Sequence, residues 1–440
     1  MATTNATAKP ARAAASTELD LCLGQTGQRV GRLIHVKQGQ REFSQFSYAP
    51  DWLASTQVFD VSPDLDRVPG WQLRKPTAKE DSCFFLALAD TEPDTWGRRV
   101  IARAHAKARR NNPGLPALTE LDYLSRVDDA SRIGALRLRN AQGTCLASAE
   151  PGQRNTPVLL ELDKVLAASR AVELSRETLE DLRYLQGKAT SLGGLRPKCT
   201  LLDADGSLAL GKFPSVQDER SVTRGEVLAL RLAQMAGIDT ASARIETVQG
   251  SPVVVVRRFD RTADKARIPY LSGASMLQAR RGEERAYTEL VDAMRAKGQD
   301  FQADARALWR RVVFNFLITN VDDHLHNLGF LYAGRNQWRL APAFDLNPFP
   351  DKDRESKTWL SEDSGPVGSV QQLMEQAPRF ELNPRQALVT LGQVVQAVEQ
   401  WREVALSARV GMTPDDLTDF ESAFEHEGLE EARAQVAGKA

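Results

Sequence analysis

The chain has 440 residues, of which 42% are hydrophobic and 26% charged, and its formal net charge is −1. This length accommodates two or three domains with real cores, and the near-neutral charge gives no general attraction to nucleic acid or anionic membranes. No apolar run reaches membrane-spanning length. The four cysteines contain no CxxC pair, which argues against a metal knuckle or a disulfide framework and suits a reducing cytoplasm.

The first third of the chain predicts a strand-rich subdomain behind a short tail. Residues 1–18 are rich in alanine and threonine, so we expect a disordered tail rather than a secretory signal. Residues 29–36 and 41–48 are bracketed by glycine and polar residues, as paired strands are. Asp94 is a candidate N-cap of a basic helix, which we interpret as a solvated face rather than a phosphate-backbone contact. This subdomain is expected to span residues 19–150.

A Gly-rich turn then precedes a predicted hairpin. Gly193 and Gly194 come before a strand at 199–202, and an Asp-Ala-Asp-Gly turn at 203–206 leads to a second strand that carries Lys212. Backbone N–H groups of such a turn can approach phosphate oxygens, and a lysine on the next strand can neutralise them. The alternative is a plain turn followed by an ordinary strand-end lysine.

The next segments supply possible partners for that lysine. Residues 223–236 predict an amphipathic helix with Glu226 in its first turn, where a carboxylate either favours the helix dipole or pairs with Lys212. The apolar run 253–256 predicts a buried strand that leads into residues 257–259. In a kinase, this place in the chain is where the two lobes join and adenine binds.

The chemically richest stretch follows an apolar helix predicted over residues 308–317. Asp322 and Asn327 are five residues apart, and Asp345 comes later, after two short strands. Protein kinases place a catalytic base five residues before a metal-binding amide, and a second metal-binding aspartate further on. On this stretch alone, a phosphoryl-transfer site and a polar loop with a capping aspartate are about equally favoured.

The histidines of this stretch suggest a rival zinc hydrolase site. His324 and His326 stand beside two aspartates, and imidazole and carboxylate both suit zinc. A zinc site needs further ligands, however, and histidine is scarce, so this alternative ranks below the kinase. The remaining histidines of the chain are His35, His105 and His426.

The remainder of the chain is predicted to be mainly helical. Residues 388–401 indicate one long core helix, Thr413-Pro414 opens another with a cap and an N1 proline, and the chain from about residue 428 is expected to fray. We therefore predict an α+β, two-lobed, protein-kinase-like fold, with a strand-rich N-terminal lobe and an all-helical C-terminal lobe. Residues 151–265 would form the kinase N-lobe and residues 266–440 the C-lobe.

Five motifs in this order resemble those of the HipA family, a group of bacterial serine/threonine kinases that act as toxins in toxin–antitoxin pairs. The likeness runs from the N-terminal strands to the C-terminal helices. The motifs are Pro93-Asp94-Thr95-Trp96-Gly97-Arg98, Ser191-Leu192-Gly193-Gly194, Arg258-Phe259-Asp260-Arg261, residues 320–327 and Phe344-Asp345.

The resemblance implies a role for each matching residue. Asp322 would be the catalytic base, Asn327 and Asp345 the magnesium ligands, and Ser191 an inhibitory autophosphorylation site. Glu226 is the possible partner of the phosphate lysine. The implied ATP-binding residues are Gly193, Gly194, Leu195, Arg196, Pro197, Lys198, Lys212, Arg257, Arg258, Phe259, His324, Asn327 and Asp345.

The resemblance also implies ATP and Mg²⁺ as cofactors and a cytoplasmic protein that binds no membrane. The implied partners are a small helix-turn-helix antitoxin (HipB-like), operator DNA contacted mainly through it, and a protein substrate such as an aminoacyl-tRNA synthetase. Three positions depart from the family pattern: Asp323 replaces a glycine, His326 a lysine, and Arg257 an acidic residue. No catalytic group is lost, so an active enzyme is favoured over a kinase-like scaffold that only binds the antitoxin.

Overall fold

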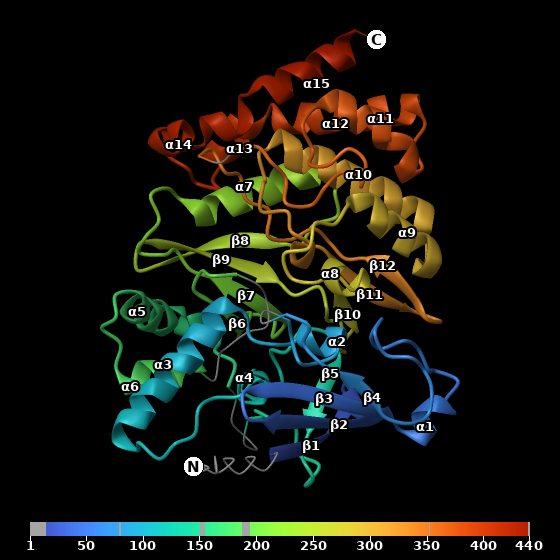
Figure 1. Cartoon of the computed structure of the whole chain (residues 1–440). Coiled ribbons are helices and arrows are strands. Elements are labelled where there is room, and N and C mark those ends of the chain that lie inside the picture. Colours follow the sequence, from blue (N-terminus) through green and yellow to red (C-terminus); the bar gives the residue numbers. More distant parts are fainter. Residues whose placement is uncertain (1–14, 79–80, 150–154, 187–193, 352, 439–440) are drawn as a thin grey trace, which may run out of the picture.

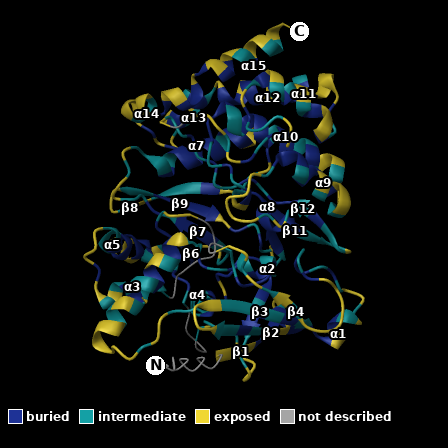
Figure 2. Ribbon diagram, viewed as in Figure 1, coloured by how far each residue is buried: buried dark blue, intermediate teal, exposed yellow. Residues whose placement is uncertain are grey.

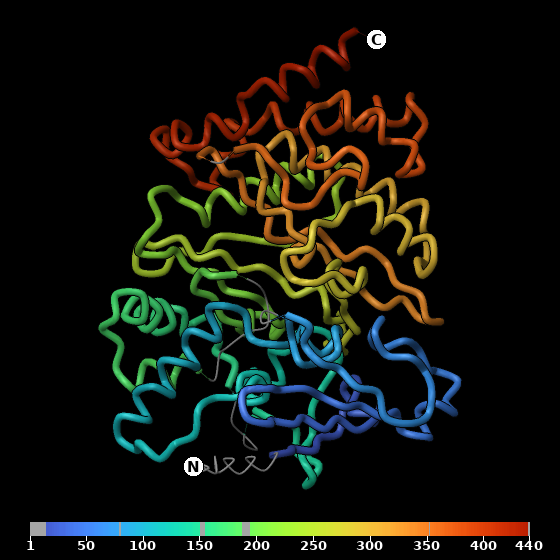
Figure 3. Tube along the Cα trace, in the orientation of Figure 1, coloured from blue at the N-terminus to red at the C-terminus, as the bar shows by residue number. Residues whose placement is uncertain are grey.

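The computed structural model describes residues 15–78, 81–149, 155–186, 194–351 and 353–438. Ser191 and Gly193 lie outside the described residues. Residues 15–18, which the sequence assigned to the tail, instead begin strand β1 (Ala15–Leu23), because they pair with β2 from Ala15 opposite Lys37 onward. Figure 3 follows the chain from its first strands, drawn in blue at one end of the molecule, to its last helices, drawn in red at the other.

An antiparallel sheet of five strands, in the order β4-β3-β2-β1-β5, forms the N-terminal end of the molecule (Figure 1). The two strands predicted around residues 29–48 are confirmed as β2 and β3, paired along their length. Leu33 and Phe46 face each other in this pairing and are fully buried, which gives the sheet its apolar face. The remaining strands are β2 (Gln28–Gln38), β3 (Arg41–Tyr48), β4 (Gln72–Arg74) and β5 (Leu136–Arg139).

Short helices and one long helix connect strands of this sheet, with α1 between β3 and β4 and the others between β4 and β5. Asp94 is confirmed as an N-cap, because its Oδ1 accepts a hydrogen bond of 2.6 Å from the Gly97 amide at the start of α3 (Thr95–Asn111). The other helices of this part are α1 (Pro50–Leu53), α2 (Leu86–Ala89) and α4 (Glu120–Ser125).

The central sheet has four antiparallel strands in the order β6-β7-β9-β8 and is covered on both faces. Val253 and Val255 pack with α3, α5 and α6, whereas Val254 and Val256 belong to the core that contains α7. Side chains alternate between the two faces of a strand, so all four consecutive valines are buried. The elements are α5 (Leu162–Glu173), α6 (Leu179–Gln186), β6 (Lys198–Leu202), β7 (Leu208–Lys212), α7 (Val222–Met235), β8 (Ala243–Val248) and β9 (Ser251–Arg257).

Helices form the C-terminal end of the molecule, and their outer faces carry most of the exposed residues there (Figures 1 and 2). The α+β, kinase-like fold is confirmed, but the C-terminal lobe is not all-helical as predicted, because it also contains a three-stranded sheet in the order β10-β11-β12. These strands are β10 (Tyr270–Ser272), β11 (Gly329–Gly334) and β12 (Gln337–Leu340). The helices are α8 (Gly273–Met276), α9 (Tyr287–Lys297), α10 (Phe301–Leu317), α11 (Val370–Gln376), α12 (Pro384–Val398), α13 (Trp401–Leu406), α14 (Pro414–Phe424) and α15 (Glu427–Ala437).

Two predictions for the C-terminal helices were wrong. The expected helix through residue 401 is broken after Val398, and Trp401 begins α13, where it stacks on Phe424 of α14 at 4.8 Å. The chain after residue 428 does not fray, because α15 buries Leu429 and Ala432 in the helical core. Tertiary burial decides both cases, and neither is visible in local periodicity.

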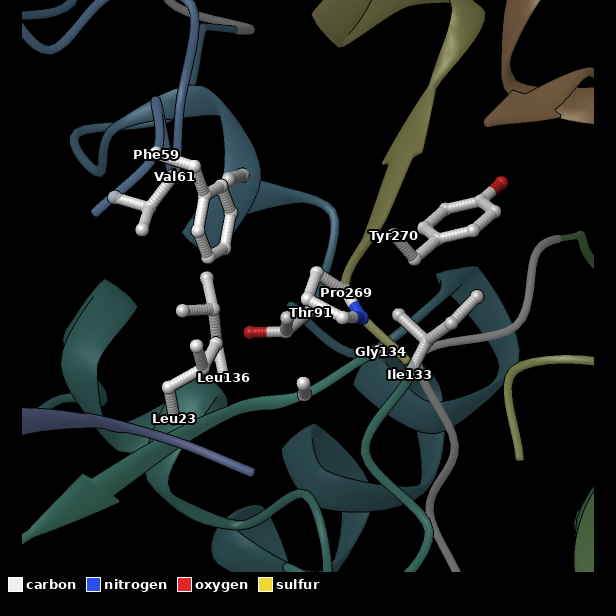
Figure 4. Close-up of a pocket in the computed structure, with 11 residues that line it drawn as sticks. Leu23, Phe59, Val61, Thr91, Ile133, Gly134, Leu136, Pro269 and Tyr270 are labelled. Carbon is white, nitrogen blue, oxygen red and sulfur yellow. The ribbon is translucent and has the colours of Figure 1, made fainter. Parts of the chain in front are cut away.

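A small cavity of about 10 Å³ lies where the N-terminal sheet meets the segment entering β10. Figure 4 shows Leu23, Phe59, Val61 and Leu136 on one side of it and Tyr270 on the other. A space this small holds no more than about one water molecule. Within the described part of the chain, no helix is long and apolar enough to cross a membrane.

Candidate active site

Lys212 lies between two carboxylates at the centre of the molecule. Its Nζ is 2.5 Å from Oε1 of Glu226, in the first turns of α7, and 2.6 Å from Oδ1 of Asp345. The pair of Lys212 and Glu226, left open by the sequence, is therefore formed. The hairpin β6–β7 presents the lysine, and the chain after β12 brings in the aspartate from 133 residues away. One buried cation thus joins three separate segments of the fold.

The electrostatics of this cluster depend on its burial. Burial alone would raise the pKa of Asp345, but Lys212 and Lys198 outweigh it and hold that pKa well below the usual range. Burial opposes charge on Lys212 as well, yet Asp345 and Glu226 raise its pKa. Asp345 also has a left-handed backbone conformation (φ +55°), which costs a non-glycine residue on the order of 1 kcal/mol. Strain of this kind is typical of functional sites.

Lys198 adds a second buried cation to the same site. It lies opposite Lys212 in the β6–β7 ladder, and its Nζ is 3.6 Å from Oδ2 of Asp94, the residue that caps α3. Burial lowers the pKa of Lys198 and raises that of Asp94, with each charge partly offsetting the effect on the other. The Asp94 carboxylate therefore holds in place a lysine that stands at the end of the Gly-rich segment.

The loop after α10 brings Asp322 and Asn327 together. The Asn327 side-chain nitrogen donates a hydrogen bond of 2.8 Å to the backbone carbonyl of Asp322. This bond fixes the amide so that its oxygen remains available as an acceptor. Nε2 of His324 lies 4.0 Å from Oδ1 of Asp322, and burial lowers the pKa of this imidazole. The negative charges of Asp322 and Asp345 act in the opposite direction and raise the pKa of His324, but burial outweighs them.

Asp323, the residue that departs from the family glycine, anchors a distant segment to this loop. Its buried carboxylate accepts hydrogen bonds from the Tyr287 hydroxyl and from the Lys357 amide, each 2.7 Å long. The hydroxyl of Thr358 donates to the backbone carbonyl of Asp323 at 2.6 Å. Burial raises the pKa of Asp323 to about 6 despite these bonds. The segment held in this way places Lys357 Nζ against Oδ1 of Asp322 in an ion pair.

The remaining predicted residues belong to two segments, the Gly-rich turn and the predicted adenine hinge. Leu195 is exposed, Arg196 pairs with Asp218, and the Pro197 carbonyl accepts the Phe213 amide at 2.9 Å. Of the two predicted glycines, Gly194 alone lies within the described residues, and its φ of +94° favours glycine.

The predicted adenine hinge at residues 257–259 is occupied by structural contacts of its side chains. Arg258 is buried and binds Asp260 at 2.5 and 2.7 Å, and Arg257 pairs with Asp205 at the surface. Phe259 packs on Phe344 at 5.3 Å, beside Asp345. The backbone amides of Arg257 and Arg258 are also engaged, because they donate to the carbonyls of Ser242 and Leu208 at 2.8 and 3.0 Å.

Three site residues escaped the sequence reasoning. Lys357 comes from a loop with no motif, and no local signal could have placed it beside Asp322. Asp94 was identified only as a helix cap, although its motif was part of the family resemblance. Asn347 donates to Oδ1 of Asp345 at 3.3 Å.

A zinc site at the two histidines finds no further histidine nearby. The rings of His324 and His326 are 6.0 Å apart, while His426 is buried against the Leu317 carbonyl at 3.1 Å. Among the described residues, the one group with metal-ligand spacing is His35, Glu42 and Cys83, in the N-terminal subdomain. Glu42 of that group already accepts a hydrogen bond from Lys37.

Comparison with known proteins finds relatives named as kinases and a solved structure with the same fold. Two relatives bear the name putative kinase: Y4mE of Sinorhizobium fredii, 27% identical over 340 residues (73% of this chain, 75% of the relative), and a protein of Haemophilus influenzae, 24% identical over 203 residues (40% and 59%). The fold is that of HipA from Shewanella oneidensis MR-1, solved with HipB and operator DNA, with a TM-score of 0.62 at 15% identity over 96% of this chain and 97% of that one. The HipA-like C-terminal domain family matches residues 190–402. Over these residues the chain is therefore similar to the C-terminal domain of HipA-like proteins.

Proposed function

We propose that the chain is an ATP- and magnesium-dependent protein serine/threonine kinase that acts as a HipA-type toxin. The observation that carries this proposal is the meeting of Lys212, Glu226 and Asp345 in one buried cluster, next to the loop that bears Asp322 and Asn327. Lysine, helix glutamate, catalytic-loop aspartate and asparagine, and a second aspartate are the parts that kinase chemistry requires.

The donor set fits a hard divalent cation. The Asn327 nitrogen is occupied by the Asp322 carbonyl, so the amide oxygen remains as a ligand, and Asp345 supplies a carboxylate held in its ionised form by Lys212. Amide and carboxylate oxygens are the ligands that Mg²⁺ prefers, together with substrate phosphates. When bound, the ion would neutralise phosphate charge, and Lys212 and Lys198 would supply further positive charge at the same place.

Asp322 would accept the proton of a serine or threonine hydroxyl as its oxygen bonds to the γ-phosphorus of ATP and the bond to the leaving ADP breaks. Lys357 contributes at the same point. The HipA family has a lysine at the position of His326. The side chain of Lys357, which pairs with Asp322, would supply the positive charge that this replacement removes. Asp323 acts as a positioning residue, since its carboxylate holds the Lys357 backbone at 2.7 Å. Asp323 holds the segment that carries Lys357, and Lys357 would supply the charge that is lost at His326. The departure at Asp323 would therefore compensate for the departure at His326.

A relative supports two of the partners in this proposal, the antitoxin and the operator DNA. The Shewanella protein is a HipA seen with HipB and its operator DNA, which supports a helix-turn-helix antitoxin that carries this chain to DNA. The substrate would be a cytoplasmic protein of the aminoacyl-tRNA synthetase class, and Ser191 would receive a phosphate from the kinase itself.

The proposal is tested by incubating purified Asp322→Asn with ATP, Mg²⁺ and an aminoacyl-tRNA synthetase. Loss of a positioned base should reduce phosphoryl transfer by about 10²–10⁴-fold. Nucleotide binding should persist, because Lys212 and Asp345 are intact. The control is Asp264→Asn, a surface aspartate whose carboxylate accepts a hydrogen bond from Thr262, which should transfer at the wild-type rate. Equal rates in both variants would refute the kinase assignment. Stoichiometric zinc lost on replacing His324 and His326 would favour the hydrolase instead.

A further inference from the structure

A large cavity lies away from the candidate active site. It measures about 520 Å³ and opens between the end of α7, helix α10 and the first turns of α12. Ligand pockets in proteins commonly fall between about 300 and 1,000 Å³. Its charged lining residues are four arginines and one aspartate: Arg306, Arg310, Arg311, Arg385 and Asp239. We call this cavity the arginine groove.

The arginines of the groove bind neutral groups. Arg306 donates to the Glu381 carbonyl at 2.9 Å, and Arg310 donates to the Ala236 carbonyl at 2.6 Å and to Gln393 at 2.7 Å. Among the ion pairs found in the described residues, none includes any of the four, although other arginines, such as Arg258, bind carboxylates directly. Positive charge therefore collects in the groove with little compensation.

Arg311 makes this imbalance costly. Its side chain is about nine-tenths buried, it donates to the Ala341 carbonyl at 2.7 Å, and its Nε has no hydrogen-bond partner. Burial lowers its pKa to about 10, which Asp239 and Asp304 offset only in part. A buried guanidinium without a full set of acceptors favours an anion nearby. The first turn of α12, which lines the same groove with Arg385 and Gln386, adds the positive end of a 15-residue helix.

We propose that the arginine groove binds a phosphorylated small molecule with at least two negative charges. The size of the groove and its apolar wall, which includes Ile238, Leu382 and the exposed Val389, leave room for an organic part of nucleotide size beside the phosphates. Arginine pairs well with phosphate because its planar guanidinium donates two parallel hydrogen bonds.

The walls of the groove continue into the candidate active site. Arg310 binds the carbonyl of Ala236, the residue that follows α7, and this helix carries Glu226 near its other end. The Asp239 carbonyl accepts the Ala343 amide at 2.8 Å, two residues before Asp345. A ligand in the groove would thus hold the segment that presents Asp345, so we expect occupancy to change the rate of phosphoryl transfer. This coupling rests on the proposed kinase function, whereas binding in the groove does not.

The test measures binding of inorganic pyrophosphate to the full chain by calorimetry, without ATP. The variant is Arg385→Glu, an exposed residue whose replacement should leave folding intact, with Arg306→Gln as a second variant. Each should weaken binding roughly 10-fold or more, the loss of one charge-assisted contact. The matched control is Arg433→Gln, a surface arginine of α15 paired with Glu399, which should bind as wild type does. Lys198→Gln should also retain binding, because that lysine belongs to the other site.

Equal affinity of wild type, Arg385→Glu and Arg306→Gln would overturn the proposal. So would binding that is lost in Lys198→Gln alone, which would assign pyrophosphate to the candidate active site. A short DNA duplex that binds in place of pyrophosphate, and is lost in Arg385→Glu, would replace the small molecule with a nucleic-acid backbone. Pyrophosphate binding in the groove of a protein that transfers no phosphate would leave this inference standing while the proposed kinase function fails.

Discussion

Lys212→Met removes the cation that lies between the buried carboxylate of Glu226 and the partly buried carboxylate of Asp345. Lys212 Nζ is 2.5 Å from Glu226 and 2.6 Å from Asp345, so the two acidic oxygens are no more than about 5 Å apart. Two such charges repel each other by about 3 kcal/mol at an effective dielectric constant of 20. Breaking a buried pair by removing one partner typically costs about 3–5 kcal/mol. We therefore expect the free energy of unfolding at pH 8 to fall by about 3–5 kcal/mol.

The pH dependence of this loss distinguishes electrostatics from packing. Lys212 depresses the pKa of Asp345 in the folded wild type, so this contribution to stability is fully present from pH 8 to pH 5 and disappears only below the ordinary aspartate pKa of about 4. The variant lacks the contribution from the start, and one of its carboxylates can take up a proton. The difference between variant and wild type should therefore shrink between pH 8 and pH 5.

Urea unfolding at both pH values, followed by tryptophan fluorescence, measures this difference. The matched control is Lys297→Met, whose partially exposed Nζ is 3.9 Å from Asp60 and should matter by less than about 1 kcal/mol. Lys212→Met/Glu226→Gln should recover part of the lost stability, because only one unpaired charge then remains. A loss below about 1 kcal/mol at pH 8, or one that grows on acidification, would refute this reasoning.

Asp323→Asn should remove a pH-dependent loss of stability, because the raised pKa of Asp323 means that its ionisation costs the folded wild type on the order of 3 kcal/mol as the pH rises from about 4 to 6. Denaturation at pH 4 and pH 7 should therefore show that the variant gains stability relative to wild type at pH 7. An unchanged difference would contradict the burial argument. Lys357→Ala should lower kcat by roughly 10-fold or more with little change in melting temperature, because the half-exposed side chain pairs with Asp322 and its backbone contact with Asp323 is kept. Equal kcat would remove Lys357 from the site. Ser191→Ala should abolish the phosphate that mass spectrometry finds on wild type after incubation with ATP, whereas retention of that phosphate elsewhere would move the modified site. Wild-type protein that stays unmodified would leave Ser191 as a turn residue.

Local sequence patterns were enough to predict the individual elements that carry the site. The five-residue step from Asp322 to Asn327 follows an amphipathic helix, and α10 does end just before that loop. An Asp-Ala-Asp-Gly turn joins β6 to β7 and puts Lys212 at the end of a strand. Hydrogen bonds within a helix, a turn or a hairpin link residues close in the chain, so side-chain periodicity and turn chemistry report them directly.

Only the tertiary structure decided which of these groups meet and what charge surrounds them. Asp322 forms an ion pair with Lys357, which lies 35 residues further along the chain. The pairs of Lys198 with Asp94 and of Lys212 with Asp345 join residues that are more than 100 and 133 positions apart. Trp401 starts a new helix, and α15 is ordered by contacts with distant elements. The arginine groove likewise arises only where three helices converge. Burial sets the strength of each interaction, and burial is a property of the packed chain, which no spacing along the sequence reports.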